Sequence, residues 1–285
     1  MYKRQNLAIL IAISRYDHAH DLPGCTQDAR NMRQLLLACH KYDHILEITQ
    51  KTRACDIWQT LQAFVAEHQD KSVDEVMLYF SGHGYYQGDA RFCGSDFQAN
   101  QRHSTSVSNV EIDLLLRQLK PRVMVKVIDA CQSGTPYIKG EQDAFKLALG
   151  RSVLPSFISM ASSQCDQPSY VNLEGSDFTL QWIKAVLCTQ AGPIYYSDIG
   201  AYLAKAFEGN AEQTPFFVSQ GHGREMLCVM NEALARLRTP STQSPAQALS
   251  AQAQRRVGLS QHAPHRDKAM DLALKTDVLG RYAGL

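Results

Sequence analysis

The sequence lacks the features that mark membrane-spanning, secreted and nucleic-acid-binding proteins. Its N-terminal apolar run covers only residues 7–13, whereas a transmembrane helix needs about 20 residues. No apolar signal region follows Met1. Lysine and arginine total 29 against 28 aspartate and glutamate, so the net charge of +1 gives no electrostatic argument for nucleic acid or an anionic membrane. We therefore expect a cytoplasmic protein with neither partner.

The cysteines also lack the spacing of a metal site. There is no C-x2-C pair and no cysteine–histidine cluster at zinc-binding intervals, so we expect no metal ligands and no required cofactor. The even number permits disulfides, but without a secretion signal we expect free thiols in a reducing cytoplasm. The eight cysteines occupy positions 25, 39, 55, 93, 131, 165, 188 and 228.

What the sequence does have is a regular alternation of apolar runs and amphipathic segments. The predicted strands are residues 7–13, 44–49, 73–80, 122–130, 156–163 and 216–220. The predicted helices are residues 24–40, 52–68, 109–119, 177–188 and 196–207. This order predicts an α/β fold with a mostly parallel sheet and helices on both of its faces. Functional groups in such a sheet gather at the carboxyl ends of the strands.

The composition changes near residue 236. Residues 1–235 are predicted to form one domain, and residues 236–285 a Gln-, Ser-, Ala- and Pro-rich linker followed by a short helical element. The C-terminal segment is basic, with eight Lys or Arg residues against three Asp or Glu. Two interpretations stay open, a solvated tail and a segment that docks a regulatory partner.

The stretch LYFSGHGYYQG, residues 78–88, ends a predicted strand with a glycine-rich turn. A dinucleotide-binding loop has the pattern G-x-G-x-x-G and opens a helix. Here the third glycine, Gly88, comes one residue late and no helical pattern follows. The phosphate-binding interpretation therefore fails, and His83 between two glycines stays as a candidate for chemistry.

A partner for His83 stands at the end of the next predicted strand, which reads Asp129-Ala-Cys131-Gln-Ser-Gly134. If the two strands are parallel neighbours, His83 and Cys131 emerge at the same edge of the sheet. A thiol and an imidazole together perform nucleophilic catalysis, and the backbone N–H groups of Gly84 and Cys131 would stabilise the oxyanion. Alone, each of the two side chains is more often structural, and it is their joint placement that favours a dyad.

These motifs resemble the caspase/metacaspase superfamily of cysteine peptidases. S-G-H-G after one strand, D-A-C-Q-S-G after the next, and LPGCTQDARNMRQLL after the first carry the resemblance, which covers about residues 5–230. GSDF and the stretch from SQCDQPSY to DFTLQWIKAVL add to it, and the latter is typical of prokaryotic members. The resemblance implies a caspase-like three-layer fold with about six strands. It also implies that Cys131 is the nucleophile, His83 its dyad partner, and the Gly84 backbone part of the oxyanion hole.

The resemblance further implies specificity for a basic residue before the cleaved bond, the P1 residue. Animal caspases cut after aspartate and carry Q-A-C-R-G, whereas Asp129 and Gln132 stand at those positions here. Metacaspases cut after Arg or Lys and resemble this chain in having carboxylates at Asp28 and Asp129, which would repel each other without a cation between them. Asp28 has an alternative role in the helix dipole, and Asp96 is a third pocket residue or a turn former.

Other questions remain open at the level of sequence. The same fold with an apolar P1 preference, or a non-catalytic scaffold module, are the alternatives. Ca2+ dependence is not decided, because only some metacaspases require it. Since the expected substrates are proteins or peptides with Arg or Lys at P1, exposed basic residues predict self-cleavage at Lys139, Arg151 and the pair Arg255–Arg256.

Overall fold

The computed structural model describes residues 4–130, 156–163, 171–172, 175–210, 213–221 and 224–238. The chain divides into two units, Met1–Leu237 and Arg238–Leu285, and the fold below is that of the first. The predicted nucleophile Cys131, the predicted cleavage sites at Lys139, Arg151 and Arg255–Arg256, and the predicted C-terminal helical element lie outside the described residues.

A six-stranded sheet forms the centre of the first unit, in the order β12-β8-β7-β3-β1-β2. Within this sheet β1, β2, β3, β7 and β8 run parallel, and β12 is antiparallel to β8. The predicted mostly parallel sheet of about six strands is therefore confirmed. Their bounds are β1 Gln5–Ala12, β2 His44–Ile48, β3 Val73–Ser81, β7 Val123–Asp129, β8 Ser156–Ala161 and β12 Phe216–Gly221.

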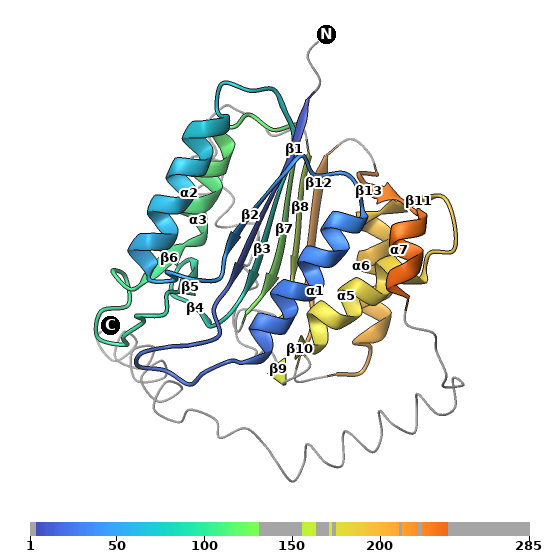
Figure 1. Cartoon of the computed structure of the whole chain (residues 1–285). Helices are drawn as coiled ribbons and strands as arrows, with labels where there is room; N and C mark the ends of the chain where they lie inside the picture. The colour runs from blue at the N-terminus through green and yellow to red at the C-terminus, as the bar shows by residue number, and fades with distance from the viewer. Residues whose placement is uncertain are drawn as a thin grey trace, which may run out of the picture. The chain divides into compact units, whose positions relative to one another are not determined.

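Helices cover both faces of this sheet, as predicted (Figure 1). On one face lie α2, Ala54–His68, and α3, Asn109–Arg117. The other face carries α1 Gly24–Ala38, α5 Asp177–Cys188, α6 Tyr196–Ala206 and α7 Glu232–Leu237. Among the described residues, none of these helices combines the length and apolar character needed to cross a membrane.

The helices form where apolar residues recur at helical spacing. In α1, Ala29, Met32, Leu35 and Leu36 lie on one face and are buried against the sheet. The predicted bounds of α5 agree with the structure, because Ser176 begins it as a cap whose hydroxyl accepts a hydrogen bond from the Thr179 N–H at 3.0 Å.

Several short strands were not predicted. β4 Gly84–Tyr86, β5 Ala90–Cys93 and β6 Ser106–Ser108 form an antiparallel three-stranded sheet directly after His83. Two further pairs are β9 Val171–Asn172 with β10 Gly175–Ser176, and β11 Pro193–Tyr195 with β13 Met226–Val229. The small sheet is what positions the backbone beyond the histidine.

Alternation along β3 places its polar residues at opposite ends of the face that carries α1 and α5. Met77 and Tyr79 lie in the core on that face. Because side chains alternate along a strand, Glu75 and Ser81 point to the same side, Glu75 at the amino end and Ser81 at the carboxyl end. The two ends of this face therefore hold separate polar clusters.

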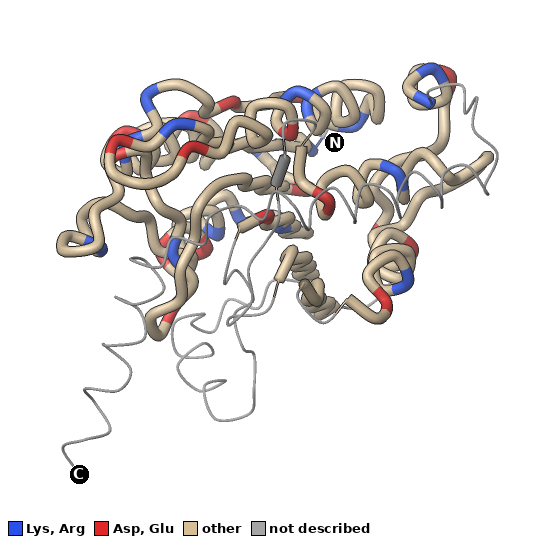
Figure 2. The backbone as a smooth tube through the Cα atoms, turned by 90° about the horizontal axis from the view of Figure 1, so that it is seen from below, with Lys and Arg blue, Asp and Glu red and all other residues tan. Residues whose placement is uncertain are grey.

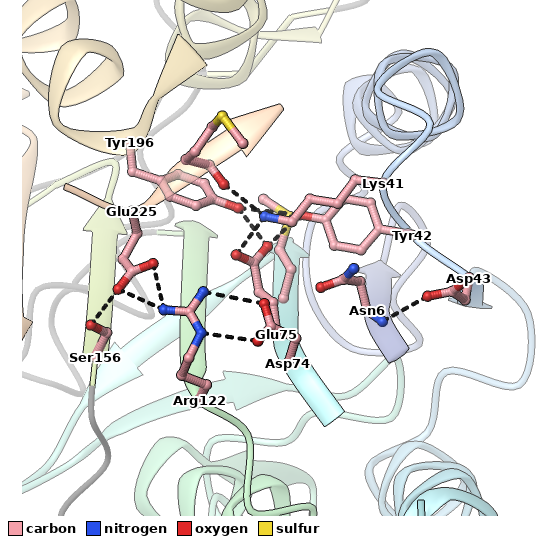
Figure 3. Close-up of polar contacts among 12 residues, drawn as sticks. Asn6, Lys41, Tyr42, Asp43, Asp74, Glu75, Arg122, Ser156, Tyr196 and Glu225 are labelled. Atoms are coloured by element: carbon pink, nitrogen blue, oxygen red, sulfur yellow. Dashed lines mark hydrogen bonds and ion pairs between the residues drawn. The ribbon is translucent and has the colours of Figure 1, made fainter. Parts of the chain in front are cut away.

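At the amino end, Glu75 is buried and receives three hydrogen bonds (Figure 3). Lys41 Nζ donates at 2.6 Å, the Tyr42 hydroxyl at 2.9 Å and the Tyr196 hydroxyl at 2.7 Å. Burial, with the charge of Glu75 added, raises the pKa of Tyr42 and of Tyr196 well above the usual range, so both remain neutral donors.

A second group of ion pairs lies beside the one around Glu75. Arg122 donates to Asp74 at 2.9 Å and to Glu225 at 3.0 Å, and the Ser156 hydroxyl also donates to Glu225. These residues and the group around Glu75 are called the amino-end cluster below. Elsewhere, basic and acidic residues are both scattered over the described backbone (Figure 2), in keeping with the net charge of +1.

Candidate active site

The carboxyl ends of β3 and β7 are adjacent, as the dyad hypothesis requires. Ser81 is opposite Asp129 in the parallel register, and the Gly82 N–H donates to the Asp129 carbonyl at 3.2 Å. His83 follows at once, and Gly84 begins β4 and is buried. β7 ends at Asp129, and Ala130, the residue before Cys131, is the last described residue of this segment. The two segments that carry the predicted dyad therefore leave the same edge of the sheet.

The His83 imidazole has a defined hydrogen bond. Its Nε2 atom lies 2.8 Å from the carbonyl oxygen of His20. Because a carbonyl oxygen only accepts, Nε2 is assigned the hydrogen, and Nδ1 becomes the basic nitrogen of the neutral ring. A histidine held in one tautomer by a backbone carbonyl is suited to take up and return a proton at Nδ1.

Asp28 and Asp129 meet in one buried cluster. Asp28 is fully buried and Asp129 is 4% exposed. Ser176 lies between them: its N–H donates to Asp28 Oδ1 at 2.9 Å, and its hydroxyl donates to Asp129 Oδ2. The Ser81 hydroxyl donates to Asp28 Oδ2 at 3.2 Å. The structure thus brings together two carboxylates that are 101 positions apart in the sequence.

A chain of hydroxyls extends from this cluster into the core. Thr179 donates to Asp129 Oδ2 at 2.6 Å, so its own oxygen accepts from the Tyr79 hydroxyl, 2.7 Å away. Burial, helped by the charges of Asp28 and Asp129, raises the pKa of Tyr79 well above its usual range. We call Asp28, Ser81, Asp129, Ser176 and Thr179 the carboxyl-end cluster.

The electrostatics of this cluster favour a positive ligand. Burial raises the pKa of Asp28 to about 7, and the negative charge of Asp129 adds to the effect. Hydrogen bonds from Ser176 and Ser81 offset only part of this rise. No Lys or Arg of the described residues forms an ion pair with Asp28. A guanidinium or ammonium group would stabilise both carboxylates in their charged form.

The geometry bears on the alternative role of Asp28 in the helix dipole and on the role of Asp96. Asp28 is not in the first turn of α1, and its oxygens bond to Ser81 and Ser176 instead of the helix N-terminus, so the dipole interpretation is wrong. Asp96 accepts the Ala54 N–H at 3.0 Å at the start of α2. Its role is therefore local and structural, and it is not part of the carboxyl-end cluster.

Some residues of the site were not singled out in the sequence. The hydroxyls of Ser162 and Ser163 both donate to the carbonyl of Ala130, at 3.2 and 3.1 Å. Ser176 did carry a signal, since a serine before a predicted helix is a good cap. No local pattern in the sequence indicates the hydrogen bonds of Ser176 to Asp28 and Asp129. Within the described ranges, no group of three or more His, Cys, Asp and Glu side chains is arranged to hold a metal ion.

Comparison with known proteins points to one family. The family described as the caspase domain matches residues 5–245. Bos taurus Caspase-13 is 28% identical over 138 residues, which is 45% of this chain and 33% of that protein. Felis catus Caspase-1 is 28% identical over 133 residues, 45% of this chain and 31% of that protein. The match thus spans about a third of the length of these curated relatives.

A solved structure agrees at the level of fold. A crystallised protein of Geobacter sulfurreducens superposes with a TM-score of 0.57 and 16% identity. The match covers 80% of this chain and all of that one. At this identity the likeness establishes a shared fold and nothing about chemistry.

Proposed function

This chain belongs to the caspase-domain family, and from that premise we propose that it is a cysteine endopeptidase that cleaves after arginine or lysine. Cys131 and His83 form its catalytic dyad. One observation carries the proposed specificity: Asp28 is buried beside Asp129 with a pKa raised to about 7. A basic P1 side chain reaching this pair would supply a positive charge to Asp28, which forms no ion pair with a Lys or Arg of the described residues.

In the proposed reaction, the Cys131 thiol gives its proton to His83 Nδ1 and the thiolate attacks the scissile carbonyl carbon. The backbone N–H groups of Gly84 and Cys131 donate to the oxyanion. The imidazolium then protonates the departing amine as the C–N bond breaks and leaves a thioester. Water, deprotonated by His83, hydrolyses the thioester and releases the free thiol.

The test compares purified wild type with Cys131→Ala and His83→Ala on peptide libraries that vary at P1. We expect cleavage after Arg and Lys, and a loss of kcat/KM of roughly 10⁴-fold or more in each variant. Cys55→Ala is the matched control, because Cys55 is an exposed free cysteine, and it should keep full activity. Retained cleavage by Cys131→Ala would refute the mechanism.

The same experiment separates the alternatives. A profile dominated by apolar P1 residues would keep the dyad and overturn the specificity. A scaffold module would cleave nothing, and a thiol probe would label wild type and Cys131→Ala alike.

Self-processing is the second part of the proposal. Basic residues at Lys139, Arg151 and Arg255–Arg256 match the proposed P1 preference. Intact-mass spectrometry of wild type beside Cys131→Ala tests it, and we expect fragments that end at these residues only where the cysteine is present. Wild type that stays at full length through a complete turnover assay would contradict self-processing while leaving the peptidase activity in place.

A further inference from the structure

The loop between β1 and α1 forms a closed turn beside His83. The Leu22 N–H donates to the Ser14 carbonyl at 2.8 Å and closes the base of the loop. Inside it, the Tyr16 N–H donates to Asp21 Oδ1 at 2.9 Å. The loop is also attached to its surroundings, because the Asp17 N–H donates to the Ser95 carbonyl at 2.8 Å. It is therefore a fixed support and not a loose connection.

Tyr16 makes two separate contacts with His83. Its hydroxyl accepts the His83 backbone N–H at 2.8 Å. Its ring lies 4.6 Å from the imidazole, centroid to centroid, with the planes tilted by 58°. Tyr16 is 8% exposed, and its hydrogen bond to His83 is partly buried. The Tyr16 hydroxyl fixes the position of the His83 backbone, and the Tyr16 ring limits rotation of the imidazole.

Glycine at position 82 is what allows the hydroxyl to come so near. A Cβ built at Gly82 would lie 2.8 Å from the Tyr16 hydroxyl oxygen and 3.0 Å from the Phe80 ring. The glycine before the histidine is thus required by the tyrosine. The S-G-H-G motif and Tyr16 are parts of one packing arrangement.

The same loop supplies the carbonyl that fixes the imidazole tautomer. His20, whose oxygen accepts from His83 Nε2, directly precedes Asp21. Asp21 in turn holds the Tyr16 amide. Asp21 therefore links the two residues that contact His83: its carboxylate binds the Tyr16 amide, and its backbone follows His20.

We infer that Tyr16 and Asp21 are positioning residues for the dyad, holding His83 at the angle and in the tautomer that proton transfer needs. This inference rests on the proposed peptidase function. Proton transfer depends steeply on geometry, and small misplacements of a catalytic group reduce rates strongly. The inferred effect is therefore on kcat, with substrate binding largely unchanged.

The test uses Tyr16→Phe, which removes the hydroxyl and keeps the ring, and Asp21→Ala, which releases the loop. We expect kcat on an Arg-P1 peptide to fall about tenfold in each, with KM within about twofold of wild type. Asp21→Asn should restore activity, since its amide oxygen still accepts the Tyr16 N–H. Tyr196→Phe is the matched control, a buried tyrosine whose hydroxyl is bonded far from His83.

A second readout needs no substrate. The rate of Cys131 alkylation by iodoacetamide reports the thiolate, which a nearby imidazolium stabilises at low pH. Tyr16→Phe should lower this rate about tenfold near pH 6 and leave it unchanged where the thiol is fully ionised. Tyr196→Phe should reduce stability without moving either the profile or kcat.

Two outcomes have distinct meanings. If Tyr16→Phe loses stability but keeps wild-type kcat and the wild-type alkylation profile, the residue is only structural and the inference is overturned. If Cys131→Ala is as active as wild type, the proposed function itself fails. The second result is visible without any Tyr16 variant.

Discussion

Buried carboxylates lie near both ends of β3, and they differ in the groups that contact them. At the amino end, Glu75 is paired with Lys41 and bonded by two tyrosine hydroxyls. At the carboxyl end, about 20 Å away by strand length, the described residues that donate hydrogen bonds to Asp28 are uncharged, and Asp129 is close enough to raise its pKa. Both carboxylates lie beside the same face of β3, but among the described residues Glu75 forms an ion pair and Asp28 does not.

This difference separates a structural cluster from a candidate binding cluster. A buried charge that already has its counter-ion and hydrogen bonds holds elements together and has no need of a ligand. A buried carboxylate without a cation costs stability, and proteins tolerate such costs mainly at functional sites. On this basis we propose that the amino end stabilises the fold and that the carboxyl end binds substrate. The following predictions test that assignment, beginning with the largest effect.

Removing charge at the carboxyl end should reduce catalysis on basic substrates most. Asp28→Asn or Asp129→Asn should lower kcat/KM on Arg-P1 peptides ~10²-fold or more, because losing one partner of a desolvated ion pair costs about 2–5 kcal/mol. Steady-state kinetics measures this, with Glu75→Gln as the control that keeps its P1 preference. Equal losses in all three variants would abolish the distinction between the two ends.

Removing charge at the amino end should reduce stability instead. Glu75→Gln leaves Lys41, whose side chain is 15% exposed, without its counter-ion, and we expect the free energy of unfolding to fall by about 3 kcal/mol. Urea denaturation provides the measurement. Asp28→Asn should show no comparable loss near neutral pH, and a loss of similar size there would contradict the comparison.

The stability of the carboxyl end should increase as the pH is lowered. The folded-state pKa of Asp28 is raised from 3.8 to about 7, so its contribution is complete below about pH 4 and disappears as the pH rises through 7. Between these limits, the stability of wild type relative to Asp28→Asn should fall by up to about 1.4 kcal/mol per pH unit. Denaturation of both proteins from acid to neutral pH tests the sign, and a difference independent of pH would refute it.

The amino end should respond to pH in the opposite direction, and weakly. The hydrogen bond from Arg122 is the main cause of the lowered pKa of Asp74. Its stabilisation is therefore present above the ordinary value of 3.8 and lost as the pH falls through the folded value. Because the Arg122 side chain is 42% exposed, solvent screens the pair, and a double-mutant cycle with Arg122→Gln and Asp74→Asn should give less than about 1 kcal/mol. A larger coupling that persists in high salt would show the pair to be shielded from water.

The parts of the fold that the sequence predicts are those whose signal is local. The strands of the main sheet are apolar runs, and α5 has both helical spacing and a serine cap, so its bounds could be predicted. The short strands β4, β5 and β6 have three or four residues each and form only by pairing with one another. The antiparallel direction of β12 likewise has no local signal, because the apolar pattern that predicts a strand does not indicate the direction in which the strand runs in the sheet.

The site follows the same rule. That His83 and Asp129 lie at adjacent strand ends follows from the order of strands in a parallel sheet. The bonds of Ser176 could not be predicted, because its partners Asp28 and Asp129 are 148 and 47 residues away in the chain. Tyr16 comes three residues after the predicted strand 7–13, and no local pattern indicates its contact with His83, which spans 67 residues.

Ser176 also has a consequence for protein engineering. Its hydroxyl donates to Asp129 and accepts the N–H of Thr179 in the first turn of α5, so one oxygen atom contacts both the carboxylate and the helix. Beside it, Gly175 has φ +126°, and a Cβ there would lie 2.4 Å from an Asp28 oxygen. A library that varies only Asp28 and Asp129 to obtain a new P1 preference would therefore disturb the start of α5. Directed evolution of specificity should recover compensating changes at positions 175, 176 and 179 together with the two carboxylates.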